Sequence, residues 1–187
     1  MFIPEFNLKS MENYSVKAAS IEDCQQIFEL YKAVSKSIGG IARTQDEITF
    51  EYINYFTRKA LDQGLQFIIK NNDDSTIIGE IHCYKLEPMV FDHILSELTI
   101  VIHPDYQSIG LGKKLFEHLL YYVEKYRQDI LRIELIARES NLKAISLYEC
   151  LGFEKEGQLK NRIKVSDTVF ESDIPMGWIN KNYENKE

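Results

Sequence analysis

The residues with the clearest chemical potential form a glycine-containing loop between a predicted strand and a predicted helix. The stretch from Ile100 to Leu115 reads IVIHPDYQSIGLGKKL. The first amides of a helix lack intrahelical acceptors, and the helix dipole places partial positive charge beside them. Glycine lets the backbone approach a ligand without a Cβ in the way. The segment 107–112, followed by Lys113 and Lys114, therefore predicts an anion site suited to a pyrophosphate.

Two other kinds of phosphate-binding loop do not fit this segment. A Walker loop requires GxxxxGK followed by Ser or Thr, which residues 110–114 (GLGKK) do not supply. A dinucleotide-binding fingerprint requires GxGxxG, and position 115 is Leu rather than Gly. The remaining alternative is that Gly110 and Gly112 only ease a tight turn.

A second motif, residues 141–153 (NLKAISLYECLGF), begins 34 residues after Gln107. Together with QSIGLG at 107–112, it resembles the GNAT superfamily of CoA-dependent N-acyltransferases, whose loop has the pattern Q/R-x-x-G-x-G/A. The resemblance covers about residues 14–178. It implies a single α/β domain with a mixed sheet, in the order β-α-α-β-β-β-α-β-α-β-β. In this fold the two central parallel strands, here 94–102 and 131–137, splay apart.

The resemblance also implies that acetyl-CoA is the acyl donor. Its pantetheine arm would lie in the gap between the two central strands, and its pyrophosphate would sit on the loop amides. The residues that match the family's cofactor-binding positions are Ile100, Val101, Ile102, Gln107, Ser108, Ile109, Gly110, Leu111, Gly112, Lys113, Asn141 and Tyr148.

Tyr148 is the candidate general acid. A phenol stays protonated at neutral pH and can donate to a departing thiolate. By resemblance, Tyr148 matches the family tyrosine that faces the CoA sulfur; the alternative is simple packing within an apolar helix. Asn141 would contact the CoA arm by the same resemblance, and Asn is equally natural as the N-cap of the helix that follows.

The general base has several candidates. Glu97 alternates with Leu98 on a strand and is expected to share a mostly buried face with Thr99 and Val101. A Glu at this place is the base in relatives that resemble phosphinothricin acetyltransferases. Glu80 and His82, on one face of a neighbouring strand, are the alternatives, and ordered water is another.

One subclass of the family acetylates protein N-termini, and some of its members carry a Glu five residues before the Asn of the second motif. Here that position is Ile136, and Glu134 does not restore the match. This difference favours a small-molecule primary amine as acceptor, with a protein amine as the alternative. A CoA-binding sensor without turnover and a plain nucleotide-phosphate binder are further alternatives.

By analogy with the family, the acceptor pocket involves the connection between the first two helices. Two glycines there would let the connection close over substrate, and Arg43 could bind a carboxylate as a planar fork. The predicted acceptor-binding residues are Gly39, Gly40, Arg43, Glu80 and His82. The block 160–178 resembles the last hairpin of the family, which often lines the acceptor site or a dimer contact, so a homodimer is a further expectation.

Hydrophobic periodicity and turn residues predict the elements that position these groups. Ser20–Asp23 resembles a capping box, and Thr44–Glu47 repeats that signature. The predicted strands are 14–18, 65–70, 76–84, 94–102, 131–137, 153–158 and 168–178, and the predicted helices are 21–37, 44–63, 110–126 and 141–150. Residues 1–13 are expected to be an N-terminal extension and 179–187 a polar tail.

The composition limits the class of protein. The 187 residues are 44% hydrophobic and 27% charged, which is typical of a globular domain. The net charge of −7 disfavours nucleic acid and anionic membrane as partners. No apolar run reaches the ~18 residues of a membrane span, and residues 1–13 do not resemble a signal peptide. Three widely spaced cysteines favour a cytoplasmic location, and four histidines without ligand spacing predict no metal.

Overall fold

A computed structural model describes residues 13–36 and 41–184 of the chain. The predicted glycine hinge at Gly39 and Gly40, most of the expected N-terminal extension and the last three residues lie outside these ranges. The chain divides into two compact units. Unit 1 runs to Tyr84 and includes residues 99–121, and unit 2 contains residues 85–98 and the chain from Tyr122 onward.

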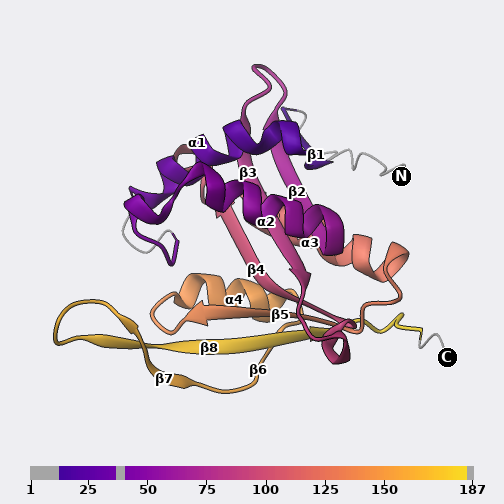
Figure 1. Ribbon diagram of the computed structural model, residues 1–187, viewed down its shortest axis with the longest axis vertical. Coiled ribbons are helices and arrows are strands. Elements are labelled where there is room, and N and C mark those ends of the chain that lie inside the picture. Colours follow the sequence, from indigo (N-terminus) through magenta and orange to yellow (C-terminus); the bar gives the residue numbers. More distant parts are fainter. Residues whose placement is uncertain (1–12, 37–40, 185–187) are drawn as a thin grey trace. The chain divides into compact units, whose positions relative to one another are not determined.

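Unit 1 is built on antiparallel strands in the order β1-β2-β3, with the second half of β4 beside β3. Figure 1 labels its elements, which are β1 (Tyr14–Ala18), α1 (Cys24–Ser35), α2 (Phe50–Gln63), β2 (Gly64–Asn71), β3 (Ile77–Lys85), β4 (Ile94–Ile102) and α3 (Leu111–Tyr126). Strand β4 and helix α3 continue into unit 2.

Side-chain caps begin the first helical segments. The Ser20 amide and hydroxyl both bond to the Asp23 carboxylate at 3.0 Å, which confirms the predicted capping box. The same signature at Thr44 forms only a short 3₁₀ turn. The prediction of one helix over 44–63 is wrong, because Ile48 adopts extended backbone and is buried. Thr49 then caps α2, accepting from the Tyr52 amide at 3.1 Å.

Gly64 joins α2 directly to β2 at a close approach to β3. A Cβ at this position would lie 2.0 Å from the carbonyl oxygen of Cys83, so no side chain fits without moving the neighbouring strand. Gly64 is thus both the C-cap of α2 and the first residue of β2.

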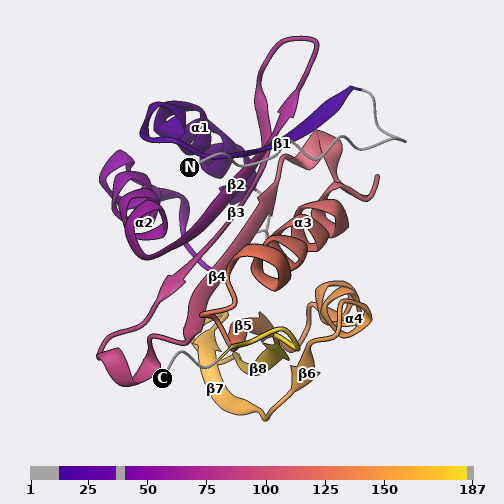
Figure 2. The same ribbon diagram turned by 90° about the vertical axis from the view of Figure 1, so that its right-hand side faces the viewer.

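Helices cover both faces of the unit 1 strands, as Figure 2 shows. Side chains of α1 and α2 contact the face that carries Glu80 and His82. Helix α3 packs on the other face, where His118 meets the Phe67 ring edge-on at 4.6 Å. The apolar stripe of α3 is fully buried at Leu111, Leu115, Leu119 and Val123. The unit 1 strands therefore carry helices on both faces.

Burial of His118 should make the protein less stable in mild acid. Desolvation lowers the pKa of His118 to about 4, whereas an unfolded histidine titrates near 6.5. Between those pH values the unfolded chain binds the extra proton, so the free energy of unfolding falls as pH drops from 6.5 to 4, by up to about 3 kcal/mol. Urea unfolding of wild type and His118→Leu at pH 7 and pH 4 measures this. The variant should lose less stability on acidification, and an equal loss in both proteins would contradict the assignment.

Unit 2 contains the parallel pairing between strands β4 and β5 (Arg132–Arg138). The first residues of β4 pair with β5 through Ile94 with Arg132 and Leu95 with Ile133. Among the described residues, this ladder ends at Leu95, although β4 and β5 both continue. The early end of the ladder fits the expected splay of the two parallel strands.

The rest of unit 2 is a set of strands on β8 (Phe170–Ile179). Strand β5 pairs with one edge of β8, while β6 (Glu154–Lys155) and β7 (Leu159–Lys164) follow each other along its other edge. Figure 1 shows β7 and β8 as a hairpin, as the resemblance predicted for this block. The strand predicted over 153–158 is shorter than expected, and β7 is an additional strand absent from the predicted order. Helix α4 (Leu142–Cys150) completes the unit.

Candidate functional site

The glycine loop lies in unit 1 and joins the end of β4 to the start of α3. A single 3₁₀ turn at Pro104–Tyr106 follows the strand, and the Gln107 amide side chain then donates to the Ile102 carbonyl at 3.1 Å. The backbone turns through the left-handed region at Ser108, with φ of 66°, and at Gly110, with φ of 92°. Two such residues around Ile109 form a compact loop that leads directly into the helix.

The first turn of α3 presents its amides to this loop. The Lys114 amide bonds back to the Gly110 carbonyl at 3.1 Å, and the preceding amides belong to the helix start, which offers no intrahelical acceptors. The loop and helix N-terminus therefore have the donor arrangement that binds an anion.

Gly112 has a packing role that the sequence did not reveal. A Cβ there would sit 3.7 Å from an Ile102 side-chain carbon and 3.9 Å from one of Ile100. These are ordinary contact distances, so Ala fits and a longer side chain would press on β4. The lysines after it, Lys113 and Lys114, contact Glu117 at 3.8 and 3.5 Å. This acidic neighbour offsets part of the positive charge predicted at the helix start.

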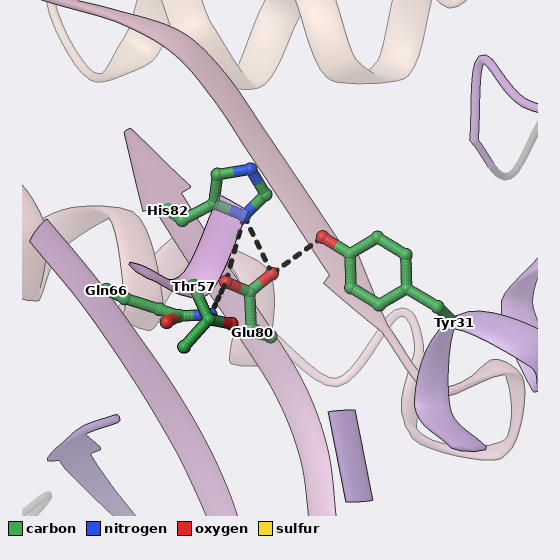
Figure 3. Close-up of polar contacts among 5 residues, drawn as sticks. All are labelled: Tyr31, Thr57, Gln66, Glu80 and His82. Atoms are coloured by element: carbon green, nitrogen blue, oxygen red, sulfur yellow. Dashed lines mark hydrogen bonds and ion pairs between the residues drawn. The ribbon is translucent and has the colours of Figure 1, made fainter. Parts of the chain in front are cut away.

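A buried polar network occupies the other face of unit 1 (Figure 3). Glu80 is fully buried and accepts hydrogen bonds from the Tyr31 hydroxyl at 2.8 Å and the Gln66 amide at 2.9 Å. The Gln66 amide also reaches the Thr57 hydroxyl at 3.3 Å. Burial and the negative charge of Glu80 raise the pKa of Tyr31 well above its ordinary value, so its hydroxyl stays a donor.

His82 is the fifth member of the network. Its Nδ1 lies 3.0 and 3.3 Å from the two Glu80 oxygens, and only 2% of the residue is exposed. The imidazole stacks on Phe56 with ring centres 4.0 Å apart, and Tyr84 lies parallel to it at 6.2 Å. The sequence placed Glu80 and His82 on one strand face, which is confirmed, but it did not identify Tyr31, Gln66 or Thr57 as their partners.

Glu97 does not occupy the environment that the sequence predicts for it. Strict alternation would bury it with Leu95 and Val101, which are both buried. Instead its backbone adopts φ of 54°, in the left-handed region, and its side chain is exposed. The expectation that Glu97 shares a buried face with Thr99 and Val101 is wrong, because this unusual backbone interrupts the pleat.

Two candidate residues lie together on helix α4 in unit 2. Asn141 caps the helix by accepting from the Ala144 amide at 3.2 Å, so its predicted capping role is confirmed. Tyr148 is half-buried, with its ring centre 6.1 Å from that of Phe153. Burial raises the pKa of Tyr148 to about 12. The phenol is therefore protonated throughout the physiological range, as a general acid requires.

Neither position considered for a base on β5 is suited to proton transfer. Ile136, five residues before Asn141, is apolar and half exposed. The Glu134 carboxylate accepts from Arg132 Nε at 3.0 Å, and the same guanidinium also holds Glu156. The Glu134 carboxylate is thus part of an ion-pair cluster with Arg132 and Glu156.

The helix connection of unit 1 brings Arg43 against an aromatic face. Its guanidinium carbon lies 4.0 Å from the Tyr52 ring centre, which is within cation–π range. Tyr52 in turn meets Tyr31 and Phe56 edge-on at 6.3 and 5.1 Å. Arg43 therefore stands over the aromatic cluster beside the buried network, a relation that the sequence could not show.

The described residues contain neither a candidate metal-binding cluster nor a candidate membrane-spanning helix. No group of three or more His, Cys, Asp or Glu side chains in residues 13–36 and 41–184 is arranged to hold a metal ion. In the same residues, no helix combines the length and apolar character needed to cross a membrane.

Comparison with known proteins gives consistent matches over most of the chain. The ribosomal protein bS18-alanine N-acetyltransferase of Escherichia coli K12 is 33% identical over 108 residues, which are 58% of this chain and 69% of that protein. A GNAT-family acetyltransferase from Streptococcus pneumoniae has a TM-score of 0.78 at 22% identity, covering 89% of this chain and 99% of that one. An acetyltransferase from Salmonella typhimurium, solved with acetyl-CoA, has a TM-score of 0.76 at 17% identity, covering 94% and 98%.

The two structural matches show a shared fold, and the relative from Escherichia coli adds similarity in sequence. The model of the acetyltransferase (GNAT) family matches residues 25–153, a range that contains the glycine loop, the buried network and helix α4. The chain belongs to the GNAT family of acetyltransferases.

Proposed function

We propose that this protein transfers the acetyl group of acetyl-CoA to a primary amine. The observation that carries the proposal is the loop at 107–112, where left-handed backbone at Ser108 and Gly110 leads into the first turn of α3. Such a loop supplies several N–H donors to one diphosphate. The backbone of β4 at Ile100–Ile102 would bond the pantetheine arm, as the family resemblance implies.

Tyr148 is proposed as the general acid of this reaction. The thioester carbon accepts the amine nitrogen, the C–S bond then breaks, and the departing thiolate takes a proton. A phenol whose pKa is about 12 holds that proton until the thiolate forms, because thiols have pKa values near 8.5.

The proposed acceptor is the α-amine of a polypeptide. The support is the sequence similarity to an enzyme named for an alanine of ribosomal protein bS18, at 33% identity. That similarity outweighs the single difference at Ile136, because a base can be supplied from another strand without changing the acceptor.

A second candidate acceptor is a small amine that carries a carboxylate, such as a free amino acid. It is favoured by Arg43, whose guanidinium lies over the Tyr52 ring and could bind a planar carboxylate through its N–H groups. Substituting Arg43 by Ala should then raise KM for the amino acid and leave KM for a peptide unchanged.

An acceptor panel tests the proposal. Thiol release from acetyl-CoA should be fastest with an alanine-initiated peptide, with kcat/KM at least about tenfold above that for free alanine or spermidine. The same peptide with a blocked N-terminus is the control and should give no release. Preference for alanine or spermidine would contradict the polypeptide acceptor, and no release with any amine would contradict the enzymatic activity.

A further inference from the structure

We infer that His82 is the general base that removes the proton from the acceptor amine, with Glu80 as the residue that positions it. This inference rests on the proposed acetyl transfer and adds the catalytic group that the proposal leaves open. It depends on the contacts of one buried cluster within unit 1.

The contact between His82 and Glu80 fixes which ring nitrogen can accept a proton. Nδ1 lies 3.0 and 3.3 Å from the carboxylate oxygens, so in the neutral ring the Nδ1 hydrogen points to Glu80. The lone pair of the neutral imidazole is then on Nε2. Figure 3 shows Nε2 on the side of the ring away from the carboxylate, and among the described residues no hydrogen bond occupies it.

The partners of Glu80 hold its carboxylate in place. Tyr31 and Gln66 donate to its two oxygens at 2.8 and 2.9 Å, and His82 is the third donor. These contacts satisfy both oxygens of the buried carboxylate and fix its position against the imidazole.

Packing holds the ring in one orientation. Phe56 stacks on the imidazole with an interplanar angle of 9°, and Tyr84 lies at 3° to it. A rigid, correctly tautomerised imidazole is the arrangement that general-base catalysis requires. The other titratable or charged groups near the ring are Tyr31 on α1, Tyr84 on β3, Lys59 on α2, whose ammonium lies 5.9 Å from the Tyr84 ring centre, and Arg43.

The register of the strands places His82 beside the strand expected to bind the acyl donor. The His103 amide donates to the Ile78 carbonyl at 2.8 Å, and the Ile102 side chain lies over Gly79. These neighbours run in opposite directions along β3 and β4, so the strands are antiparallel at this point. Continued along both strands, this register would set His82 opposite Thr99, one residue before the backbone assigned to the pantetheine arm.

The other carboxylates considered are less suited to the task. Glu97 is exposed on left-handed backbone, and Glu134 is held by Arg132. His82 is the candidate whose Nδ1 is held by a carboxylate while Nε2 has no hydrogen-bond partner among the described residues.

The proposed step is balanced in atoms and charge. The amine nitrogen forms the new N–C bond to the acetyl carbon while its proton moves to Nε2 of His82. The C–S bond breaks, and its electron pair goes to the CoA sulfur, which takes the proton of the Tyr148 hydroxyl proposed as general acid. The phenolate then regains a proton from solvent. The imidazolium then releases its proton to solvent, leaving the acetylated amine and free CoA.

The test compares His82→Asn with wild type. The Asn amide nitrogen can still donate to Glu80, but it cannot accept a proton. At neutral pH, kcat/KM should fall about a hundredfold, the acidic limb of its pH profile should disappear, and the Kd for acetyl-CoA should not change. Glu80→Gln should move that limb rather than abolish it. Cys83→Ser, a change at the adjacent buried position, is the matched control and should keep the wild-type profile.

A full rate with a wild-type pH profile in His82→Asn would overturn the inference and leave the network as structural support. In that case wild type would still bind acetyl-CoA and turn over. The proposed acetyl transfer would then stand, and only the role of His82 would be wrong. Nitrogen-15 NMR of the histidines in the wild-type protein gives an answer even if the variant does not fold. At neutral pH His82 should show its proton on Nδ1, and a ring that carries its proton on Nε2 instead would also overturn the inference.

Discussion

Replacing Ile109 by Asp should weaken acetyl-CoA binding by about tenfold or more, whereas Ile109→Asn should leave it within about threefold of wild type. Ile109 is 48% exposed and lies between the two left-handed residues, Ser108 and Gly110. A carboxylate there would face the diphosphate at short range. Two unit charges about 6 Å apart repel by roughly 2–3 kcal/mol at an effective dielectric constant near 20.

The pair of substitutions separates charge from shape. Asp and Asn have nearly the same size, and neither is placed on left-handed backbone, so both variants should fold equally well. Substitution of Gly110 would be less informative, because its φ of 92° strains any side chain. Isothermal titration with acetyl-CoA measures the effect, and equal affinity of the Asp and Asn variants would remove the loop from the binding site.

The second large effect is expected for Tyr148→Phe. Removal of the phenol hydroxyl should lower kcat about a hundredfold, while the Kd of acetyl-CoA stays within about threefold. The reason is that the hydroxyl acts on the thiolate, which exists only after the C–S bond begins to break. Stopped-flow thiol release measures kcat, and equilibrium titration measures the Kd.

A control variant for this substitution is Tyr126→Phe, at an exposed tyrosine at the end of α3. It should keep the wild-type kcat. Full activity of Tyr148→Phe would therefore reduce Tyr148 to a packing residue against Phe153.

Much of the fold could be predicted because local sequence and tertiary packing agree. The strand over 94–102 and the helix predicted over 110–126 both form with nearly the predicted bounds, and α3 buries its leucines. The Ser20 capping box is also a local feature, in which one side chain satisfies nearby donors. These elements needed no knowledge of their neighbours.

The errors arise where a distant contact or an exposed surface decides the structure. Ile48 enters the core and ends the turn that Thr44 begins. Strand β7 has five exposed positions among its six residues, so it carries no alternation to detect, and its pairing with β8 defines it.

In the candidate site, too, the local motif could be predicted and the contacts between distant parts of the chain could not. Residues 107–112 form one local motif that leads from a loop into the first turn of α3, as predicted. The contacts of Glu80 could not be predicted, because Tyr31 is 49 positions and Gln66 14 positions away in the chain. The exposure of Glu97 depends on a left-handed backbone angle, which hydrophobic pattern does not encode.

Backbone amide NMR with two acetyl donors tests the diphosphate site most directly. Acetyl-CoA and acetylpantetheine carry the same thioester and arm, but only acetyl-CoA has the diphosphate. The amide resonances of 108–113 should move strongly with acetyl-CoA and stay in place with acetylpantetheine. If these resonances respond equally to both compounds, or to neither, the diphosphate does not bind at the N-terminus of α3 and the proposed site is wrong.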